Sequence, residues 1–316
     1  MIYLYIAIGL LLSGVFFYGF MIIYASYCIY TKTLKRQSKD HWGRAVSSNE
    51  EPTLQMDAIG MQWHQEHIAN KQDVHIVRDN MNLYGEYYDF GYDKAVIIFS
   101  GRTESLRYGY YFAKPYYEFG CNILVIDPRA HGLSDGEYNT IGFEESLDAL
   151  EWTRFLAEQK HIPSVIYHGI CIGAATGMFA ITNEACPQCV KGIVTEGMFA
   201  NFSCSMRNHL IERKKLMFPL LQCIDFWMKH YTGHSMRIGP IHVIGKLKKP
   251  ILMLQSKEDR YSTVENAQKL FDLCGSADKQ LVLFPYGAHS MLRITDTLKY
   301  DREITAFLEN LFLTGI

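Results

Sequence analysis

The sequence has almost no excess of charge of one sign. Its 31 lysine and arginine residues are balanced by 33 aspartate and glutamate residues, so the net charge is −2. Nucleic-acid-binding proteins normally carry a broad basic surface, and this balance gives no sign of one. We therefore expect no nucleic-acid partner.

Metal-binding patterns are also scarce. The eight cysteines are scattered, and the one close pair, Cys186 and Cys189, has no second CxxC or ordered Cys/His partner to complete a zinc set. A domain of this size does not require disulfides, so free thiols in a reducing compartment are expected. No metal and no organic cofactor are predicted.

Charge is missing altogether from Ile2 to Tyr30. A helix of about 20 apolar residues crosses a bilayer, so residues 1–31 are predicted to form a transmembrane anchor. The basic start and short apolar run of a cleaved signal peptide are missing. Positive residues follow the span and none precedes it, which favours a single-pass membrane protein with its C-terminal domain in the cytoplasm. These residues are Lys32, Lys35, Arg36, Lys39 and Arg44.

A polar stretch follows the anchor. Residues 32–55 are interpreted as a polar linker without a core of its own, because they include the run Ser47-Ser-Asn-Glu-Glu-Pro52. The next domain is predicted over residues 56–316. Near its start, His64 and His67 are interpreted as solvated surface rather than as a metal pair, since no third ligand accompanies them. A short amphipathic helix is predicted there from the spacing of Met56, Ile59 and Trp63.

The pattern then changes from a hairpin to alternating strands and helices. Val74–Val77 and Leu83–Tyr88 are β-rich runs separated by Asp79-Asn80, which predicts the hairpin. Segments of helical period, including Phe143–Leu156 and Val264–Leu273, then alternate with continuous apolar runs. This alternation predicts an α/β fold with a mostly parallel central sheet covered by helices on both faces. The apolar runs are Ala95–Phe99, Asn122–Ile126, Ser164–Tyr167, Gly192–Thr195, Ile251–Leu254 and Leu281–Phe284.

More than 50 residues separate the strand predicted to end near Thr195 from the one that begins at Ile251. An ordinary crossover is shorter, so residues 198–245 are interpreted as a helical lid insertion. The segment mixes large apolar side chains with basic ones. Such a mixture suits a lid over an apolar acyl chain or contact with an anionic lipid surface. An ordinary helical insertion with a solvated basic face is the alternative.

A G-x-C-x-G motif at residues 169–173 follows a predicted strand and opens a helix. In a nucleophile elbow, glycines allow close packing while the nucleophile stands clear of the backbone on a strained turn. Asp259 and His289 each follow one of the later predicted strands, so the chain order is nucleophile, acid, histidine. We predict a catalytic triad of Cys171, Asp259 and His289, with Glu258 as the competing acid.

These motifs resemble those of the α/β-hydrolase superfamily, within the lid-bearing branch related to serine aminopeptidases and monoacylglycerol lipases. The resemblance covers roughly residues 70–313. Its most specific match is Asp127-Pro-Arg-Ala-His-Gly-Leu-Ser-Asp-Gly136, which is similar to the family's D-x-R-x-H-G-x-S-x-G. Two features depart from the family pattern. Cys171 stands where serine is usual, and Ser100-Gly-Arg-Thr103 stands where His-Gly is usual at the oxyanion loop.

The resemblance implies roles for further residues. Backbone N–H groups of Ile172 and Arg102 are the expected oxyanion hole, with Thr103 replacing Arg102 after a small shift of register. Cysteine is also found at the nucleophile position in dienelactone hydrolases and polyhydroxyalkanoate synthases, so a working thiol is compatible with the resemblance. The residues expected to brace the loop beneath the active site, rather than to catalyse, are Asp127, Arg129 and His131.

The predicted chemistry is attack of the Cys171 thiolate on an acyl carbonyl. His289 takes the thiol proton, and Asp259 fixes the imidazole tautomer. The predicted function is a membrane-anchored hydrolase of ester, thioester or related acyl bonds, acting on a small, lipid-like acyl substrate. Two alternatives stay open: an acyltransferase with the same triad, and a catalytically inactive α/β-hydrolase scaffold that binds a membrane partner.

Overall fold

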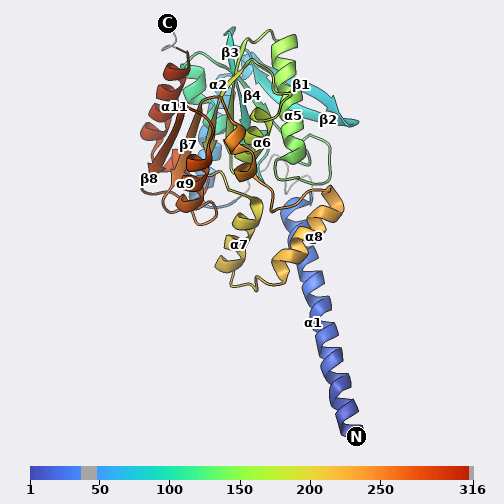
Figure 1. Ribbon diagram of the computed structural model, residues 1–316. Coiled ribbons are helices and arrows are strands. Elements are labelled where there is room, and N and C mark those ends of the chain that lie inside the picture. Colours follow the sequence, from blue (N-terminus) through green and yellow to red (C-terminus); the bar gives the residue numbers. More distant parts are fainter. Residues whose placement is uncertain (37–47, 313–316) are drawn as a thin grey trace.

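An eight-stranded sheet forms the centre of the computed structural model, which describes residues 1–36 and 48–312 (Figure 1). Its strands are β1 (Lys71–Arg78), β2 (Met81–Tyr88), β3 (Lys94–Phe99), β4 (Asn122–Ile126), β5 (Ser164–Ile170), β6 (Val190–Glu196), β7 (Ile251–Ser256) and β8 (Lys279–Phe284). They lie in the order β1-β2-β4-β3-β5-β6-β7-β8. The pairs β1–β2 and β2–β4 are antiparallel and the others are parallel. The fold is the predicted α/β-hydrolase fold.

Helices cover both faces of this sheet. One face carries α5 (Phe143–Arg154), α6 (Ile172–Ile181) and α9 (Val264–Leu273), and the other carries α2 (Glu51–Glu66) and α11 (Thr297–Phe312). Alternate side chains of β3 belong to the two opposite cores, and all of them from Ala95 onward are buried. A strand buried on both faces has a continuous apolar sequence, and for this reason the apolar runs predicted the strands. The shorter elements are η1 (Ile68–Asn70), α3 (Leu106–Gly109), η2 (Tyr110–Phe112), α4 (Lys114–Glu118), η3 (Phe155–Gln159), η4 (Pro240–His242), η5 (Ile244–Lys246) and α10 (Leu292–Thr295).

Two helices occupy the segment predicted as a lid insertion over residues 198–245. They are α7 (Phe202–Glu212) and α8 (Leu220–Thr232), and they lie on the side of the domain from which α1 (Ile2–Leu34) projects (Figure 1). One apolar cluster joins these three helices to the start of α6. Its buried members include Tyr30, Leu34, Ile172, Met206 and Met228.

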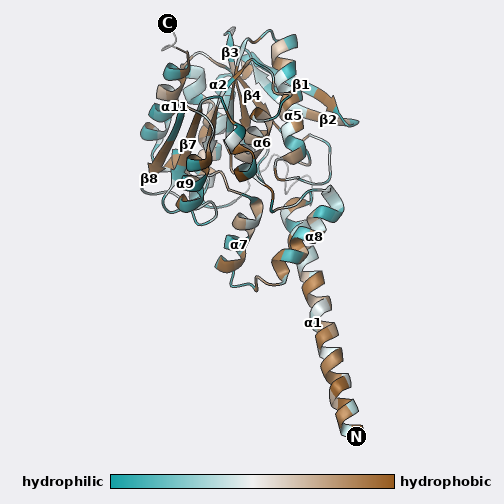
Figure 2. Ribbon diagram, in the orientation of Figure 1, coloured by the Kyte–Doolittle hydropathy of each residue, from teal (hydrophilic) through white to brown (hydrophobic). Residues whose placement is uncertain are grey.

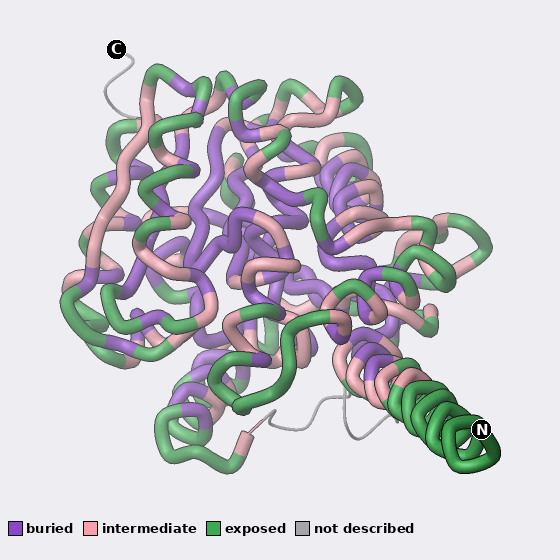
Figure 3. Tube along the Cα trace, turned by 60° about the horizontal axis from the view of Figure 1, so that its bottom comes forward, coloured by how far each residue is buried: buried purple, intermediate pink, exposed green. Residues whose placement is uncertain are grey.

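The helix α1 is 33 residues long and apolar enough to cross a membrane. Figure 2 shows its outer part as largely apolar, and Figure 3 shows that part as exposed. Near the domain, Ser26, Tyr30 and Leu34 are buried, and their spacing of four residues places them on one face of the helix. Trp227 Nε1 donates to Ser26 Oγ at 2.9 Å, and the rings of Tyr30 and Tyr231 stack with centroids 5.6 Å apart. The inner end of α1 is therefore packed against α8 and belongs to the domain's core.

The linker predicted over residues 32–55 is wrong at its N-terminal end. The anchor predicted to stop at residue 31 continues as helix to Leu34. Arg36 then donates to the carbonyl oxygens of Ser134 and Gly132, at 2.8 and 2.6 Å. The Arg36 side chain therefore binds the domain, a difference that composition does not reveal. Residues 37–47, in the middle of the predicted linker, lie outside the described residues.

The same prediction is wrong at its C-terminal end, because α2 begins at Glu51. Pro52 occupies the first turn, where its missing N–H has no intrahelical partner to lose. Thr53 is already buried, so the helix contributes to the core before the predicted domain boundary at residue 56. The amphipathic helix predicted from Met56, Ile59 and Trp63 lies within this longer one. Met56 and Trp63 are buried, but Ile59 is exposed, so its assignment to the apolar face is wrong.

The prediction that His64 is solvated surface is also wrong. His64 is buried, with its Nδ1 atom 2.5 Å from the Tyr88 hydroxyl and its ring stacked on Tyr110. Both tyrosines donate to the buried carboxylate of Glu86 on β2, at 3.1 and 2.5 Å. A buried carboxylate needs such partners, and His64 lies in the shell that supports them. His67 is half-buried, and its Nδ1 lies 2.8 Å from Trp63 O.

The packing of α1 against the domain leads to a stability prediction. Leu34→Ala should lower the free energy of unfolding by about 2–5 kcal/mol, because it leaves a cavity in a fully buried site. Leu12→Ala is the matched control on the same helix. Leu12 is 63% exposed, so this change should lower the free energy of unfolding little. Thermal unfolding of the two full-length variants in detergent provides the measurement. Equal shifts in Tm would contradict the packed arrangement.

Candidate active site

Cys171 lies between the end of β5 and the start of α6, with φ 55° and ψ −111°. A non-glycine residue at this φ is strained, and such strain persists only where the surroundings impose it. Here the two flanking glycines allow the chain to pack tightly. A Cβ added at Gly173 would lie 2.0 Å from Phe99 O, and one added at Gly169 would lie 2.3 Å from Gly173 O. The predicted motif therefore forms a sharp strand-to-helix turn that presents a partly exposed thiol.

The structure brings Asp259 and His289 together beside this thiol. His289 Nδ1 and Asp259 Oδ2 are 2.7 Å apart. The other carboxylate oxygen of Asp259 accepts the N–H groups of Tyr261 and Ser262, at 2.8 and 2.9 Å. The His289 ring also interacts with the sulfur of Cys171, which raises the pKa of the histidine. The structure therefore brings the three residues of the predicted triad together, with the His289–Asp259 hydrogen bond holding the imidazole beside the thiol.

Two further residues fix the position of His289. Glu258, the competing acid, accepts the N–H of Gly287 at 3.1 Å and so holds the loop that carries the histidine. Gly197 packs against the imidazole, because a Cβ added there would lie 3.1 Å from His289 Cε1. Its φ of +59° is also one that glycine adopts readily. The geometry therefore pairs the histidine with Asp259 and gives Glu258 a supporting position.

Charges around His289 favour its protonated form. Burial by itself lowers the pKa of His289, but the sulfur of Cys171 and the carboxylate of Asp259 together raise that pKa well above its ordinary value. A raised pKa means that the imidazolium persists to higher pH than in a free histidine. This arrangement suits a thiolate–imidazolium pair.

The same balance of charges gives a titration prediction. In Cys171→Ala the pKa of His289 should fall relative to the parent, because the contribution of the sulfur is lost while that of Asp259 remains. The imidazole would then become neutral at lower pH than in the parent. Titration of the His289 ring signals by NMR measures both values, with His289→Gln used to assign them. An unchanged or higher pKa in the alanine variant would contradict the Cys171–His289 interaction.

The loop after β3 lies next to the nucleophile. A Cβ added at Gly101 would lie 3.9 Å from Cys171 Cβ. Gly101 O accepts the N–H of Glu104 at 3.4 Å, which makes Arg102 and Thr103 the central residues of a turn. The N–H groups of central turn residues point outward, so both stay candidates for the oxyanion hole.

The second candidate donor comes from α6, where Ile172 is the first helical residue. The first N–H groups of a helix have no intrahelical partner and are available to an anion. On the opposite side, the His131 ring contacts Arg102 O and so positions the peptide of the oxyanion loop. The residues expected to supply the oxyanion hole therefore lie near Cys171.

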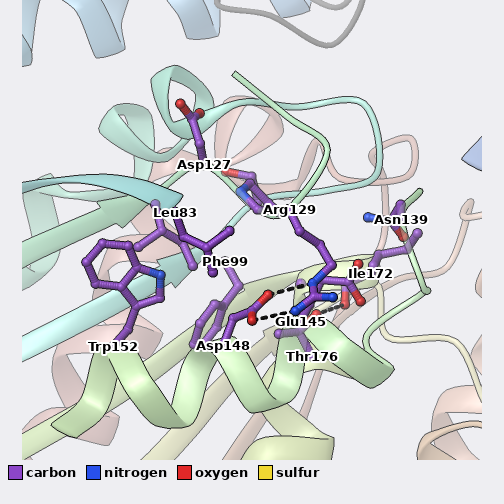
Figure 4. Close-up of a pocket in the computed structure, with 14 residues that line it drawn as sticks. Leu83, Phe99, Asp127, Arg129, Asn139, Glu145, Asp148, Trp152, Ile172 and Thr176 are labelled. Atoms are coloured by element: carbon purple, nitrogen blue, oxygen red, sulfur yellow. Dashed lines mark hydrogen bonds and ion pairs between the residues drawn. The ribbon is translucent and has the colours of Figure 1, made fainter. Parts of the chain in front are cut away.

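Asp127 and Arg129, in the loop after β4, form hydrogen bonds that support this part of the domain. Arg129 forms two hydrogen bonds to the Asp148 carboxylate, at 2.8 and 2.6 Å, and Figure 4 shows them meeting at a small cavity of about 10 Å³. The Asp127 carboxylate accepts the N–H groups of Leu106 and Leu133, at 2.8 and 2.9 Å. These contacts join the loop after β4 to α5 and to the start of α3, which agrees with the bracing role that the resemblance implied.

Glu196, at the end of β6, is a buried carboxyl group absent from the predicted site residues. Its backbone oxygen accepts the N–H of Cys171 at 2.9 Å. Its side chain accepts the Tyr300 hydroxyl at 2.7 Å and the N–H of Leu292 at 3.1 Å. Burial raises the pKa of Glu196. It links the elbow to α10 and α11, and the one sequence signal for it was a glutamate that ends a buried apolar strand.

Two openings lie next to the candidate site. A cleft of about 610 Å³ contains Asp259 and His289, and the other side chains lining it are mostly polar. A smaller pocket of about 90 Å³ lies between α1 and α7 and contains Arg102. Tyr261 and His209 separate them, with ring centroids 3.8 Å apart, and Tyr261 also meets His289 edge-on. Within the described residues, no group of three His, Cys, Asp or Glu side chains is arranged to hold a metal.

Comparison with known proteins agrees with this fold. No family model matches the chain. The uncharacterized protein YqkD of Bacillus subtilis (strain 168) is 27% identical over 219 residues, which cover 68% of this chain and 71% of that protein. The uncharacterized membrane protein YNL320W of Saccharomyces cerevisiae is 23% identical over 192 residues, covering 57% of this chain and 59% of that protein. An esterase of Pyrococcus furiosus has a similar structure, with a TM-score of 0.66 at 22% identity, covering 78% of this chain and 94% of that chain. Similarity at this level shows the α/β-hydrolase fold.

Proposed function

We propose that this protein is a membrane-anchored hydrolase of ester, thioester or related acyl bonds that acts through Cys171, His289 and Asp259. One observation carries the proposal. A strained cysteine at a strand-to-helix turn interacts with a histidine whose Nδ1 lies 2.7 Å from a buried carboxylate. A strained thiol beside an imidazole does not stabilise a protein core, whereas nucleophilic catalysis requires such a pair.

The reaction takes place in two halves. The Cys171 thiolate attacks the acyl carbonyl carbon, and the negative charge that develops on the oxygen is stabilised by the N–H groups of Ile172 and Arg102 or Thr103. His289 holds the thiol proton and gives it to the leaving group as the carbon–oxygen or carbon–sulfur bond breaks. Water then gives a proton to His289 and attacks the Cys171 thioester, which releases the carboxylic acid and restores the thiol.

The membrane location is part of the proposal. The helix α1 would cross the bilayer once, and a relative whose name describes a membrane protein supports this assignment. Lys32, Lys35 and Arg36 follow the span, and an excess of positive charge favours the cytoplasmic side for the domain. Protease added to sealed inside-out vesicles should digest the domain, while protease added to intact cells should not. The opposite pattern would reverse the orientation.

The catalytic proposal is tested by trapping the acyl-enzyme. Full-length protein in detergent is mixed with p-nitrophenyl esters from acetate to palmitate, and released p-nitrophenol and the mass of the Cys171 peptide are both followed. We expect turnover, together with an acyl adduct on Cys171 that neutral hydroxylamine removes. His289→Ala should form the adduct far more slowly.

Two outcomes would favour the alternatives. An alcohol or amine is added to the reaction. If a new ester or amide then forms in place of the free acid, the protein is an acyltransferase. If the folded protein shows no turnover and forms no adduct, it is a scaffold without catalysis.

A further inference from the structure

The smaller pocket beside the candidate site is built partly from the membrane helix. Ile29 and Thr33 of α1 form one wall, and Phe202, Met206 and Leu210 of α7 form another. The three α7 residues are buried, and they share one apolar cluster with Cys171 and Ile172. The pocket therefore lies between α1 and α7, and its apolar wall on α7 belongs to the same packed cluster as the nucleophile.

The oxyanion loop and α1 meet in this pocket. Arg102 Nη1 donates to Thr33 O at 3.2 Å, so the side chain of an oxyanion-loop residue is attached to the membrane helix. The charge of Arg102 also interacts with Cys171. A change in α1 near Thr33 would therefore alter the position of Arg102 beside Cys171.

The exposed part of the pocket is positively charged. Arg213 and Lys215 line it and are exposed, and no acidic residue is among the described residues that line it. The neighbouring carboxylate, Glu212, is already engaged by Tyr261 and Arg260. These exposed cations favour contact with an anionic surface.

The level of the bilayer follows from the length of α1. Its exposed part from Ile2 to Tyr24 rises about 33 Å, close to the thickness of the hydrocarbon core of about 30 Å. The next turns of α1 carry Ile29 and Thr33, so the pocket would lie at the membrane surface. The last turn of α7 and its connection to α8 lie on this side of the domain (Figure 1) and expose both apolar and basic side chains. They are Ile211, Arg213, Lys214, Lys215, Leu216, Met217 and Phe218.

We propose that this pocket holds the acyl chain of the substrate and that α1 supplies one of its walls, so that a long-chain acyl ester or thioester enters directly from an anionic bilayer. The inference rests on the proposed acyl hydrolysis. The acyl chain would lie between α1 and α7 with its carbonyl at Cys171, and the leaving group would exit through the polar cleft beside His289. The membrane helix would then select the substrate as well as anchor the enzyme.

The first test places a larger side chain of α1 in the pocket. Ile29→Trp is compared with Ile23→Trp, whose site is 52% exposed on the outer part of the same helix. Full-length protein in vesicles of phosphatidylcholine and phosphatidylglycerol is assayed with p-nitrophenyl acetate and palmitate. We expect Ile29→Trp to reduce kcat/KM for palmitate by roughly tenfold or more relative to acetate. Ile23→Trp should keep the parental ratio, and a parental ratio in Ile29→Trp would overturn the inference while leaving the hydrolase proposal intact.

A second measurement does not depend on turnover. A fatty acid with a photoreactive group on its chain is crosslinked in the same vesicles, and the labelled peptides are mapped. Label on the α7 peptide that contains Met206 and Leu210 is expected in the parent and in Ile23→Trp, and it should be lost in Ile29→Trp. Labelling of only the outer part of α1 would overturn the inference even if the protein hydrolyses esters.

The basic rim is tested by charge reversal. Lys215→Glu should lower palmitate hydrolysis on vesicles that contain phosphatidylglycerol by roughly fivefold, with little change on vesicles of phosphatidylcholine alone. Arg302→Glu is the matched control, because Arg302 is an exposed cation on α11, away from α1. Equal effects of the two variants would overturn the assignment of an anionic membrane surface.

Discussion

Cys171→Ala should lower kcat for ester hydrolysis by roughly 10⁵- to 10⁶-fold, the range seen when a nucleophile that acts as one unit with its base is removed. The expected loss is this large because the two other members of the predicted triad have no atom to activate once the thiol is gone. The strained backbone at residue 171 accepts alanine no worse than cysteine, so the fold should be retained. Steady-state rates with p-nitrophenyl esters and circular dichroism of the same samples make the comparison.

A matched control separates catalysis from general thiol chemistry. Cys223 on α8 is also a free, partly exposed cysteine, and Cys223→Ala should keep the parental rate. Cys171→Ser is informative in addition, because it tests whether the same geometry supports an oxygen nucleophile. Parental activity in Cys171→Ala would contradict the proposed mechanism outright.

Asp259→Asn should lower kcat by about 10⁴-fold. One carboxylate oxygen of Asp259 accepts the N–H groups of Tyr261 and Ser262, and the amide oxygen of asparagine would take that place. The amide NH₂ would then face His289 Nδ1, where it can donate but cannot accept. The imidazole would be held in the tautomer that has its proton on the nitrogen facing Cys171, and this nitrogen could no longer accept the thiol proton.

Glu258→Gln is the matched control for this change. Glutamine keeps a carbonyl oxygen for the N–H of Gly287, so the loop should hold its shape and the rate should change little. Burst kinetics with a p-nitrophenyl ester would locate the loss in the acylation step. If the rate falls in Glu258→Gln and not in Asp259→Asn, the acid of the triad is Glu258.

Much of the fold could be predicted because its central strands are buried on both faces. All six apolar runs lie within strands β3 to β8, and the predicted hairpin corresponds to β1 and β2. The strand before the nucleophile was predicted too short, to Tyr167, whereas β5 continues to Ile170. His168 and Gly169 lack the apolar signal, yet they pair with β3 and β6 because the ladder needs only their backbone groups.

The site was predictable where local chemistry restricts the residue type. The two glycines of the elbow are required by contacts of 2.0 and 2.3 Å, so the motif could be recognised without a structure. The choice between Asp259 and Glu258 was not determined in this way, because both follow the same strand. The structure separates them, since one faces His289 and the other binds Gly287.

The sequence by itself determined the elements that depend on near neighbours: an apolar span long enough to cross a membrane, the alternation of strands and helices, and the turn that presents Cys171. Only the tertiary structure decided where polar side chains bind. Trp227 donates to Ser26 across 201 positions of the chain, and Arg36 reaches Ser134 across 98, so the inner end of α1 belongs to the domain and not to a linker. His64 is buried for the same kind of reason, because its partner Tyr88 lies on another element. Such contacts depend on which distant segments the folded sheet brings together, and no local pattern of residues encodes that.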